Sequence, residues 1–181
     1  MEKITFAITG AFNEHKLARE QILNLLSSYN IRVVVSETVL DYSKELVDEL
    51  EKITVNTSYN KLKKADVLKE VNTSSMLVIA PCTGNTMSKI ANAISDNTVT
   101  MLAKAHMRNN KPIVLAISTN DGLGLNMYNL ARLMNTKNIY FVPFKQDDFK
   151  NKPKSLMSDF NLIEQTVKQA EKNIQHQPVL L

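Results

Sequence analysis

Residues 76–97 read MLVIAPCTGNTMSKIANAISDN, and this stretch decides the fold. Its first five residues are apolar and predict a buried strand. The polar segment 81–86, which we call the elbow, predicts a tight turn. An amphipathic helix is predicted after it, because four apolar residues recur at helical spacing, namely Met87, Ile90, Ala91 and Ile94. In an open α/β sheet, a strand, a polar turn and a helix N-terminus in succession form a place where ligands bind.

The same alternation of short apolar runs and longer amphipathic stretches extends along the chain. Strands are predicted at residues 3–8, 31–35, 76–80, 113–117 and 139–142. Helices are predicted at residues 14–28, 41–53, 61–71, 87–97, 98–109, 126–135 and 159–174, with a charged loop at 143–153. Asp41 is the predicted N-cap of the second helix, and Met127 and Met134 are predicted to face the core.

This alternation indicates βαβ units and a parallel sheet. The predicted fold class is therefore three-layer α/β, a Rossmann-like open parallel sheet with helices on both faces. We expect a single domain over residues 1–181, with a polar tail from about residue 175.

Composition argues against several classes of protein. No apolar run approaches the roughly 20 residues of a membrane span. The net charge of +4 comes from scattered lysines, so we expect no nucleic-acid partner. The single cysteine cannot form an internal disulfide, and the start MEKITFAITG predicts a strand rather than a signal peptide. Together these features favour a cytoplasmic protein without a membrane partner.

Four polar turns follow predicted strands, at residues 9–12, 36–38, 81–86 and 118–124. The carboxyl ends of parallel strands share one edge of a sheet, so these turns are expected to converge. They are rich in hydroxyls, amides and glycine and poor in charge, which suits a phosphorylated ligand such as a nucleotide or flavin mononucleotide (FMN). The alternative is that they are ordinary turns, which the same residue types dominate.

Well-known phosphate and metal motifs are absent. The chain has neither GxxxxGK[ST] nor GxGxxG, and no His or Cys stands at metal-ligand spacing, so no metal site is expected. His15, His106 and His176 are expected at the surface. Cys82 lies in the elbow, where a helix N-terminus stabilises a thiolate. No His or Asp is placed in sequence to activate it, so a bystander or a residue lining the ligand site is favoured over a nucleophile.

Charged side chains near the predicted site offer further roles. Asp121 follows the fourth strand and is a candidate general base, or else half of an Asp-Gly turn. Lys89, Arg108 and Arg132 are candidates for binding substrate carboxylates, or else solvated surface residues.

Residues 80–97, APCTGNTMSKIANAISDN, resemble the PASANT-type motif and following helix of the homo-oligomeric flavin-containing cysteine decarboxylase superfamily. Within it, the chain is similar to the family of B subunits of bacterial dipicolinate synthases. The matching segments are residues 8–10, 104–109, 117–126, 136–144 with 146–148, and 177–179, whereas residues 40–72 match poorly.

The resemblance implies a flavodoxin-like fold, bound FMN, and a homo-oligomer with sites at subunit contacts. It implies an oxidoreductase subunit that forms dipicolinic acid from a dihydrodipicolinate-type precursor, a small dicarboxylate, during sporulation. The implied partner is a dehydrogenase-like A subunit that supplies the NAD(P) site. The alternatives are a non-catalytic partner that stabilises or regulates the A subunit, and an FMN-dependent decarboxylase.

The resemblance also implies roles for individual residues. Asn85, the asparagine of the motif, would contact the substrate carboxylate or the flavin, with Asp121 as the second catalytic candidate. The residues implied around the cofactor are Thr9, Gly10, Ala11, Phe12, Ser36, Thr38, Pro81, Thr83, Gly84, Asn85, Thr86, Ser118, Thr119 and Asn120.

Three features depart from the decarboxylase pattern. Ala11 stands where a hydroxyl residue is common. The catalytic histidine after the first helix has no clear equivalent. Residues 118–124, STNDGLG, replace the PxMNxxMW segment. Decarboxylation of a cysteine-type substrate is therefore not expected.

Overall fold

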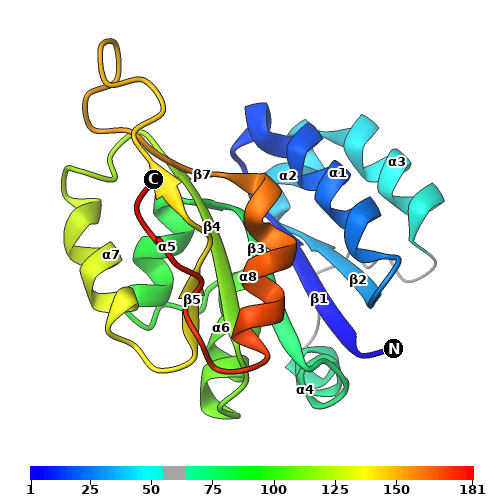
Figure 1. Cartoon of the computed structure of the whole chain (residues 1–181). Coiled ribbons are helices and arrows are strands. Elements are labelled where there is room, and N and C mark those ends of the chain that lie inside the picture. Colours follow the sequence, from blue (N-terminus) through cyan, green and yellow to red (C-terminus); the bar gives the residue numbers. More distant parts are fainter. Residues whose placement is uncertain (55–63) are drawn as a thin grey trace.

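A computed structural model describes residues 1–54 and 64–181 (Figure 1). The strands are β1 (Lys3–Ile8), β2 (Asn30–Val35), β3 (Met76–Thr83), β4 (Ile113–Thr119), β5 (Ile139–Phe141), β6 (Phe144–Lys145) and β7 (Leu156–Ser158). The α-helices are α1 (His15–Leu25), α2 (Glu37–Tyr42), α3 (Lys44–Ile53), α4 (Lys64–Thr73), α5 (Gly84–Ala91), α6 (Thr98–Arg108), α7 (Asn126–Met134) and α8 (Ile163–Ala170). Two 3₁₀ turns, η1 (Phe12–Glu14) and η2 (Phe160–Leu162), precede α1 and α8.

The described strands form one mixed sheet. Its order is β2-β1-β3-β4-β7-β6, and β5 pairs with the first half of β4. The five predicted strands, β1 to β5, are parallel, as expected. The prediction of a purely parallel sheet is wrong, because β7 pairs antiparallel with β4 and with β6.

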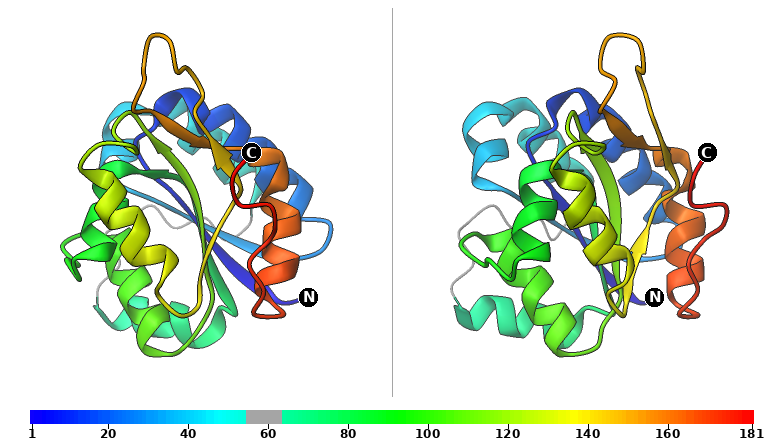
Figure 2. Two further views of the ribbon diagram at one scale, coloured as in Figure 1. Left: turned by 60° about the vertical axis from the view of Figure 1, so that its left-hand side comes forward. Right: turned by 90° about the vertical axis from the view of Figure 1, so that its left-hand side faces the viewer.

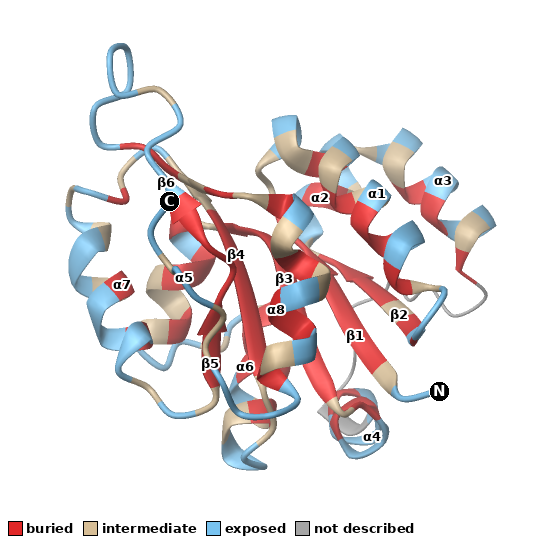
Figure 3. Ribbon diagram, in the orientation of Figure 1, coloured by how far each residue is buried: buried red, intermediate tan, exposed pale blue. Residues whose placement is uncertain are grey.

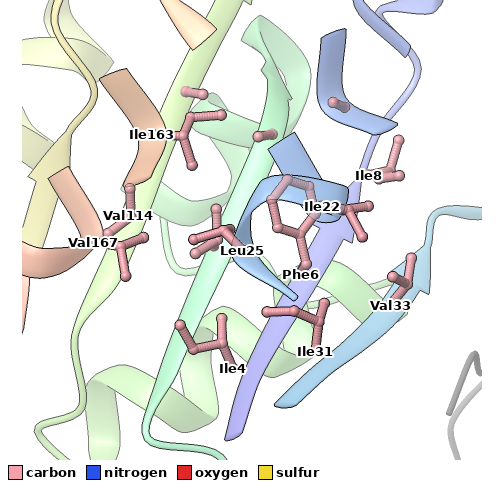
Figure 4. Close-up of a cluster of buried hydrophobic side chains, with 14 of the residues drawn as sticks. Ile4, Phe6, Ile8, Ile22, Leu25, Ile31, Val33, Val114, Ile163 and Val167 are labelled. Carbon is pink, nitrogen blue, oxygen red and sulfur yellow. The ribbon is translucent and has the colours of Figure 1, made fainter. Parts of the chain in front are cut away.

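Helices cover both faces of this sheet (Figure 2). Alternate residues along each buried strand point to opposite faces, so Phe6 packs in the cluster with α1 and α8, and Ala7 packs in the cluster with α4 to α7. Figure 3 shows the strands buried along their length, and Figure 4 shows Ile22 and Leu25 of α1 against Phe6. The three-layer prediction is confirmed.

Several predicted boundaries differ from the structure. The second predicted helix is two helices, α2 and α3, because the chain bends at Ser43 (φ −134°, ψ 50°), and Asp41 lies inside α2 rather than at an N-cap. Strand β3 continues through the elbow to Thr83, with a register shift between Ile79 and Cys82. The first residues of the helix predicted at 61–71 lie outside the described residues.

Two predicted core positions are wrong. Met127 and Met134 are 41% and 43% exposed, because α7 buries only Leu130 and Leu133 against the sheet. The predicted tail is partly ordered by pairing: Phe144 forms an isolated bridge with Leu180, and the Gln175 side chain bonds both backbone groups of Phe141. No helix in the described ranges has the length and apolar character needed to cross a bilayer.

The N-terminal edge of the sheet holds a buried charge cluster. The Glu70 side chain on α4 is 1% exposed and accepts hydrogen bonds from Thr5 Oγ1 (2.5 Å), Lys3 Nζ (2.9 Å) and Arg32 (2.7 Å). Lys111 Nζ donates to the carbonyl oxygen of Ser74 beside it (2.5 Å). This cluster fastens α4 to two strands, β1 and β2, at the edge opposite the polar turns.

His106 lies near this cluster and is fully buried, so its predicted surface position is wrong. Its Nδ1 donates to the Leu102 carbonyl at 2.9 Å, while Nε2 is buried without a partner in the described structure. Burial lowers the pKa of His106 to about 4; Lys111 also lowers it, and Glu70 opposes this change. The ring is therefore neutral in the folded protein at pH 7.

The His106 pKa gives a prediction for stability against pH. The unfolded chain, with an ordinary histidine pKa of 6.5, binds this proton more tightly than the folded protein, so stability falls as pH drops from 6.5 toward 4. Between pH 7.5 and pH 5 we expect His106 alone to remove about 2 kcal/mol. Urea unfolding of wild type and His106→Gln at both pH values measures this, and equal losses in the two proteins would contradict it.

Candidate functional site

Three of the four predicted turns line one cleft at the C-terminal edge of the sheet. The cleft has a volume of about 340 Å³. The predicted residues that line it are Gly10, Ala11, Phe12, Thr83, Ser118, Thr119 and Asn120. The convergence expected at the carboxyl ends of the parallel strands is therefore present for three of the four turns, and the volume lies within the range of small-molecule sites, roughly 300–1,000 Å³.

The cleft also has lining residues that the sequence did not indicate. Asn13 and Glu14 come from η1, and Asp147, Lys152 and Ser155 come from residues 146–155, which we call the arm. Figure 2 shows the arm projecting beyond the sheet between β6 and β7. The only signal for it was a charged loop after the fifth strand, because strands as short as β6 and β7 leave no periodic pattern.

The turn after β2 lies beside the turn after β1. A Cβ on Gly10 would lie 3.3 Å from Thr38 Cγ2, so these turns are in contact, although neither Ser36 nor Thr38 lines the cleft. The Ser36 hydroxyl is buried and has no hydrogen-bond partner in the described structure. A buried, unpaired hydroxyl is uncommon in a native fold and points to a missing partner at this turn.

Thr9 is buried and holds the elbow in place. Its Oγ1 donates to the Pro81 carbonyl at 2.8 Å and accepts from the Thr83 N–H at 3.2 Å. The Thr9 carbonyl accepts from His15 Nε2 at 2.8 Å, and Ser43 Oγ donates to His15 Nδ1 at 3.4 Å. Burial lowers the pKa of His15, and its predicted surface position is wrong. Both hydrogen bonds of the Thr9 hydroxyl are thus made to the elbow backbone.

The elbow starts α5. Thr83 is the N-cap, and its Oγ1 accepts from the Thr86 N–H at 3.2 Å and donates to Thr86 Oγ1 at 3.0 Å. Pro81 is buried, whereas Asn85 is exposed on the first turn. The N–H groups of Gly84 and Asn85 precede the first intrahelical bond, so they remain available to a ligand.

Gly84 is enclosed by two side chains, one from the last residue of β4 and one from the first residue of α7. A Cβ at Gly84 would lie 2.5 Å from Thr119 Oγ1 and 2.8 Å from Asn126 Nδ2. A Cβ here would therefore displace these two side chains. Sequence reasoning missed Asn126, which stands at the start of α7.

Asp121 has a structural partner. Its Oδ2 accepts from the Asn126 N–H at 3.3 Å, which caps α7, and its own N–H donates to Thr119 Oγ1 at 3.2 Å. Its carboxylate also occupies the space where Gly124 would carry a Cβ. This arrangement favours the turn role over the general-base role.

The three predicted substrate-binding cations lie outside the cleft. Lys89 Nζ pairs with the Asp96 carboxylate at 2.8 Å. Arg132, at the end of α7, donates to the Ala91 carbonyl at 3.0 Å, and Arg108 ends α6 before β4 begins. Since helices run antiparallel to the strands they follow, Arg108 and Arg132 lie toward the opposite edge of the sheet from the cleft.

Cys82 is fully buried, and burial raises the pKa of its thiol to about 12. We expect a maleimide to label the folded protein at least about a hundredfold more slowly than the urea-unfolded chain at pH 8, because both thiolate fraction and access are reduced. Similar rates in the two states would contradict this. In the described part of the chain no three metal-ligating side chains gather.

The fold and cleft match known proteins. A family model described as Flavoprotein matches residues 1–170. The dipicolinate synthase B subunit of Bacillus subtilis (strain 168) is 42% identical over 99% of this chain and 94% of its own length. The crystal structure of the dipicolinate synthase B subunit from Bacillus halodurans superimposes with a TM-score of 0.90, at 36% identity, covering 99% of this chain and 96% of that one.

A more distant structure shares the fold alone. The FMN-dependent cysteine decarboxylase SpaF superimposes with a TM-score of 0.73 at 18% identity, covering 94% of this chain and 98% of that one. The family model covers most of the chain, and the Bacillus relatives cover nearly all of it. The chain is therefore a member of the Flavoprotein family.

Proposed function

We propose that this chain is the B subunit of a dipicolinate synthase and that its cleft binds FMN. The observation that carries the proposal is the 42% identity to the Bacillus subtilis protein, which extends over 99% of this chain. On this proposal residues 1–181 act as one domain, and the protein works in the cytoplasm of a sporulating cell.

The residues present fit an FMN site. The unpaired Ser36 hydroxyl, the free N–H groups of the first turns and the hydroxyls of Ser118 and Thr119 supply hydrogen-bond groups for a phosphorylated, polyhydroxylated ligand. Residues 10–12 and 36–38 would hold the phosphate and ribityl chain, and residues 81–86 would border the ring. Thr9 would act by fixing the elbow rather than by touching the cofactor.

The proposed reaction converts a dihydrodipicolinate-type precursor to dipicolinate. Aromatisation of a dihydropyridine removes a hydride equivalent, and FMN, when bound, supplies an acceptor for it. Asn85, exposed at the elbow, would bind the substrate carboxylate or the ring. A dehydrogenase-like A subunit with its own NAD(P) site is the proposed partner, and this chain is proposed to form a homo-oligomer.

The test measures FMN binding and then synthesis. Purified protein is titrated with FMN and followed by flavin fluorescence, and the A subunit is then assayed for dipicolinate formation with and without this chain. We expect saturable FMN binding and a rate that requires both proteins. A protein that takes up no FMN overturns the cofactor proposal, and full activity of the A subunit alone favours the non-catalytic alternative. Full activity of Asn85→Ala would exclude the elbow as the site.

A further inference from the structure

Four polar side chains form a directed chain of hydrogen bonds between α5 and α7. Arg132 donates to Asn92 Oδ1 at 3.1 Å, and Asn92 Nδ2 donates to Asn129 Oδ1 at 3.0 Å. Asn129 Nδ2 in turn donates to Asn126 Oδ1 at 3.0 Å. This series of hydrogen bonds begins at the C-terminal end of α7 and ends beside the elbow.

The direction of this chain is fixed by its first member. A guanidinium only donates hydrogen bonds, so the oxygen of Asn92 must face Arg132 and its NH₂ must face Asn129. The Asn92 NH₂ also donates to the Ser88 carbonyl at 2.8 Å, which requires the same orientation. Each following amide must therefore turn its oxygen toward the preceding residue and its NH₂ toward the next one. Asn126 is the last amide, so its NH₂ group points away from Asn129.

That NH₂ group lies at the elbow. Asn126 Nδ2 is 2.8 Å from the position of a Cβ on Gly84, next to Thr119 Oγ1 at 2.5 Å. It makes no hydrogen bond with the described residues, and it is not among their fully buried unpaired atoms, so part of its surface is exposed. The Thr119 hydroxyl proton is also free, because its oxygen only accepts, from Asp121 N–H.

Donors therefore gather around Gly84. They are the Asn126 NH₂, the Thr119 hydroxyl and the free N–H groups of Gly84 and Asn85 at the start of α5. The carboxylate bonded to this part of the chain is that of Asp121, and its Oδ2 already accepts from the Asn126 N–H, while Glu14 and Asp147 line the cleft farther along. A group of donors without its own acceptor suits an oxygen of a ligand that carries negative charge or a carbonyl dipole.

We infer that Asn126 is a ligand-binding residue that donates to an acceptor oxygen at the elbow, and that Asn129, Asn92 and Arg132 are positioning residues that set the orientation of its amide. The inference rests on the proposed function, since the oxygen belongs either to a ring carbonyl of FMN or to a carboxylate of the dicarboxylate ligand. Arg132, predicted to bind substrate, acts here through three amides.

Two substitutions test the inference by reversing the amide. Asn126→Asp still accepts from Asn129 but presents an oxygen at the elbow. Asn129→Asp cannot donate, so Asn126 must turn its NH₂ toward residue 129 and present its own oxygen, although the elbow is untouched. Asn135→Asp is the control, because it adds the same negative charge at the exposed end of α7, outside the series of hydrogen bonds.

The probes are FMN and dipicolinate, each measured by calorimetric titration, with thermal unfolding as a check on folding. We expect both reversing variants to weaken one probe by about tenfold or more, the loss of one hydrogen bond to a charged or strongly polar group, and the control to bind like wild type. Weakened FMN binding identifies a ring carbonyl, and weakened dipicolinate binding alone identifies a carboxylate.

Wild-type affinity for both probes in folded Asn126→Asp and Asn129→Asp overturns the inference and leaves the proposed function standing. A wild-type protein that binds neither probe overturns both. If Asn126→Asp fails to fold, Asn129→Asp decides the outcome.

Discussion

Replacing Glu70 with glutamine is expected to lower the free energy of unfolding by about 3 kcal/mol, the lower end of the cost of removing one partner from a buried ion pair. The carboxylate is 1% exposed and accepts from Lys3, Thr5 and Arg32. Glutamine keeps the shape but offers one acceptor oxygen in place of two. The lower end applies because the Lys3 and Arg32 side chains are 21% and 26% exposed and can regain water.

Urea unfolding at pH 7 measures this effect. Glu49→Gln is the matched control, because the Arg19–Glu49 pair is also short at 2.7 Å but its carboxylate side chain is 53% exposed. Exposed pairs contribute about 0–1 kcal/mol, so the control should be nearly neutral. Similar losses in the two variants would mean that burial of the Glu70 cluster does not set its contribution.

The Glu70 cluster also marks the limit of what the sequence predicts. Periodicity finds elements, and it placed β1 to β5 and most helices correctly, because each buries a regular apolar pattern. The partners of Glu70 lie 38 to 67 residues away in the chain, and no local pattern links them. His106 was misplaced for the same reason: its burial depends on how α6 packs, and the sequence around it is ordinary for a surface helix.

The candidate site likewise contains residues that the sequence predicted and residues that it did not. The turns at residues 10–12, 83 and 118–120 were predicted to meet, because the carboxyl ends of parallel strands share one edge of a sheet, and they line the cleft. The arm was missed because β6 and β7 are too short to show alternation. Asp121 and Thr9 were identified as polar groups at the right edge, but whether such a group faces a ligand or a backbone N–H depends on distances that only the fold supplies.

Gly84→Ala should weaken FMN binding by about five- to a hundredfold, which corresponds to the 1–3 kcal/mol that overpacking typically costs. The added Cβ would lie 2.5 Å from Thr119 Oγ1 and 2.8 Å from Asn126 Nδ2, so both side chains must move. Thr119 would then lose its bond from the Asp121 N–H, and two of the donors at the elbow would be displaced.

The same substitution should change affinity more than thermal stability. Alanine also restricts the unfolded chain more than glycine does, a gain of about 0.4–1 kcal/mol that offsets part of the strain in the free protein. FMN titration beside thermal unfolding separates the two effects, with Ser88→Ala on the same helix as the control, since it changes side-chain size away from the cleft. An FMN affinity of Gly84→Ala within twofold of wild type would mean that the space above Gly84 is not part of the binding site.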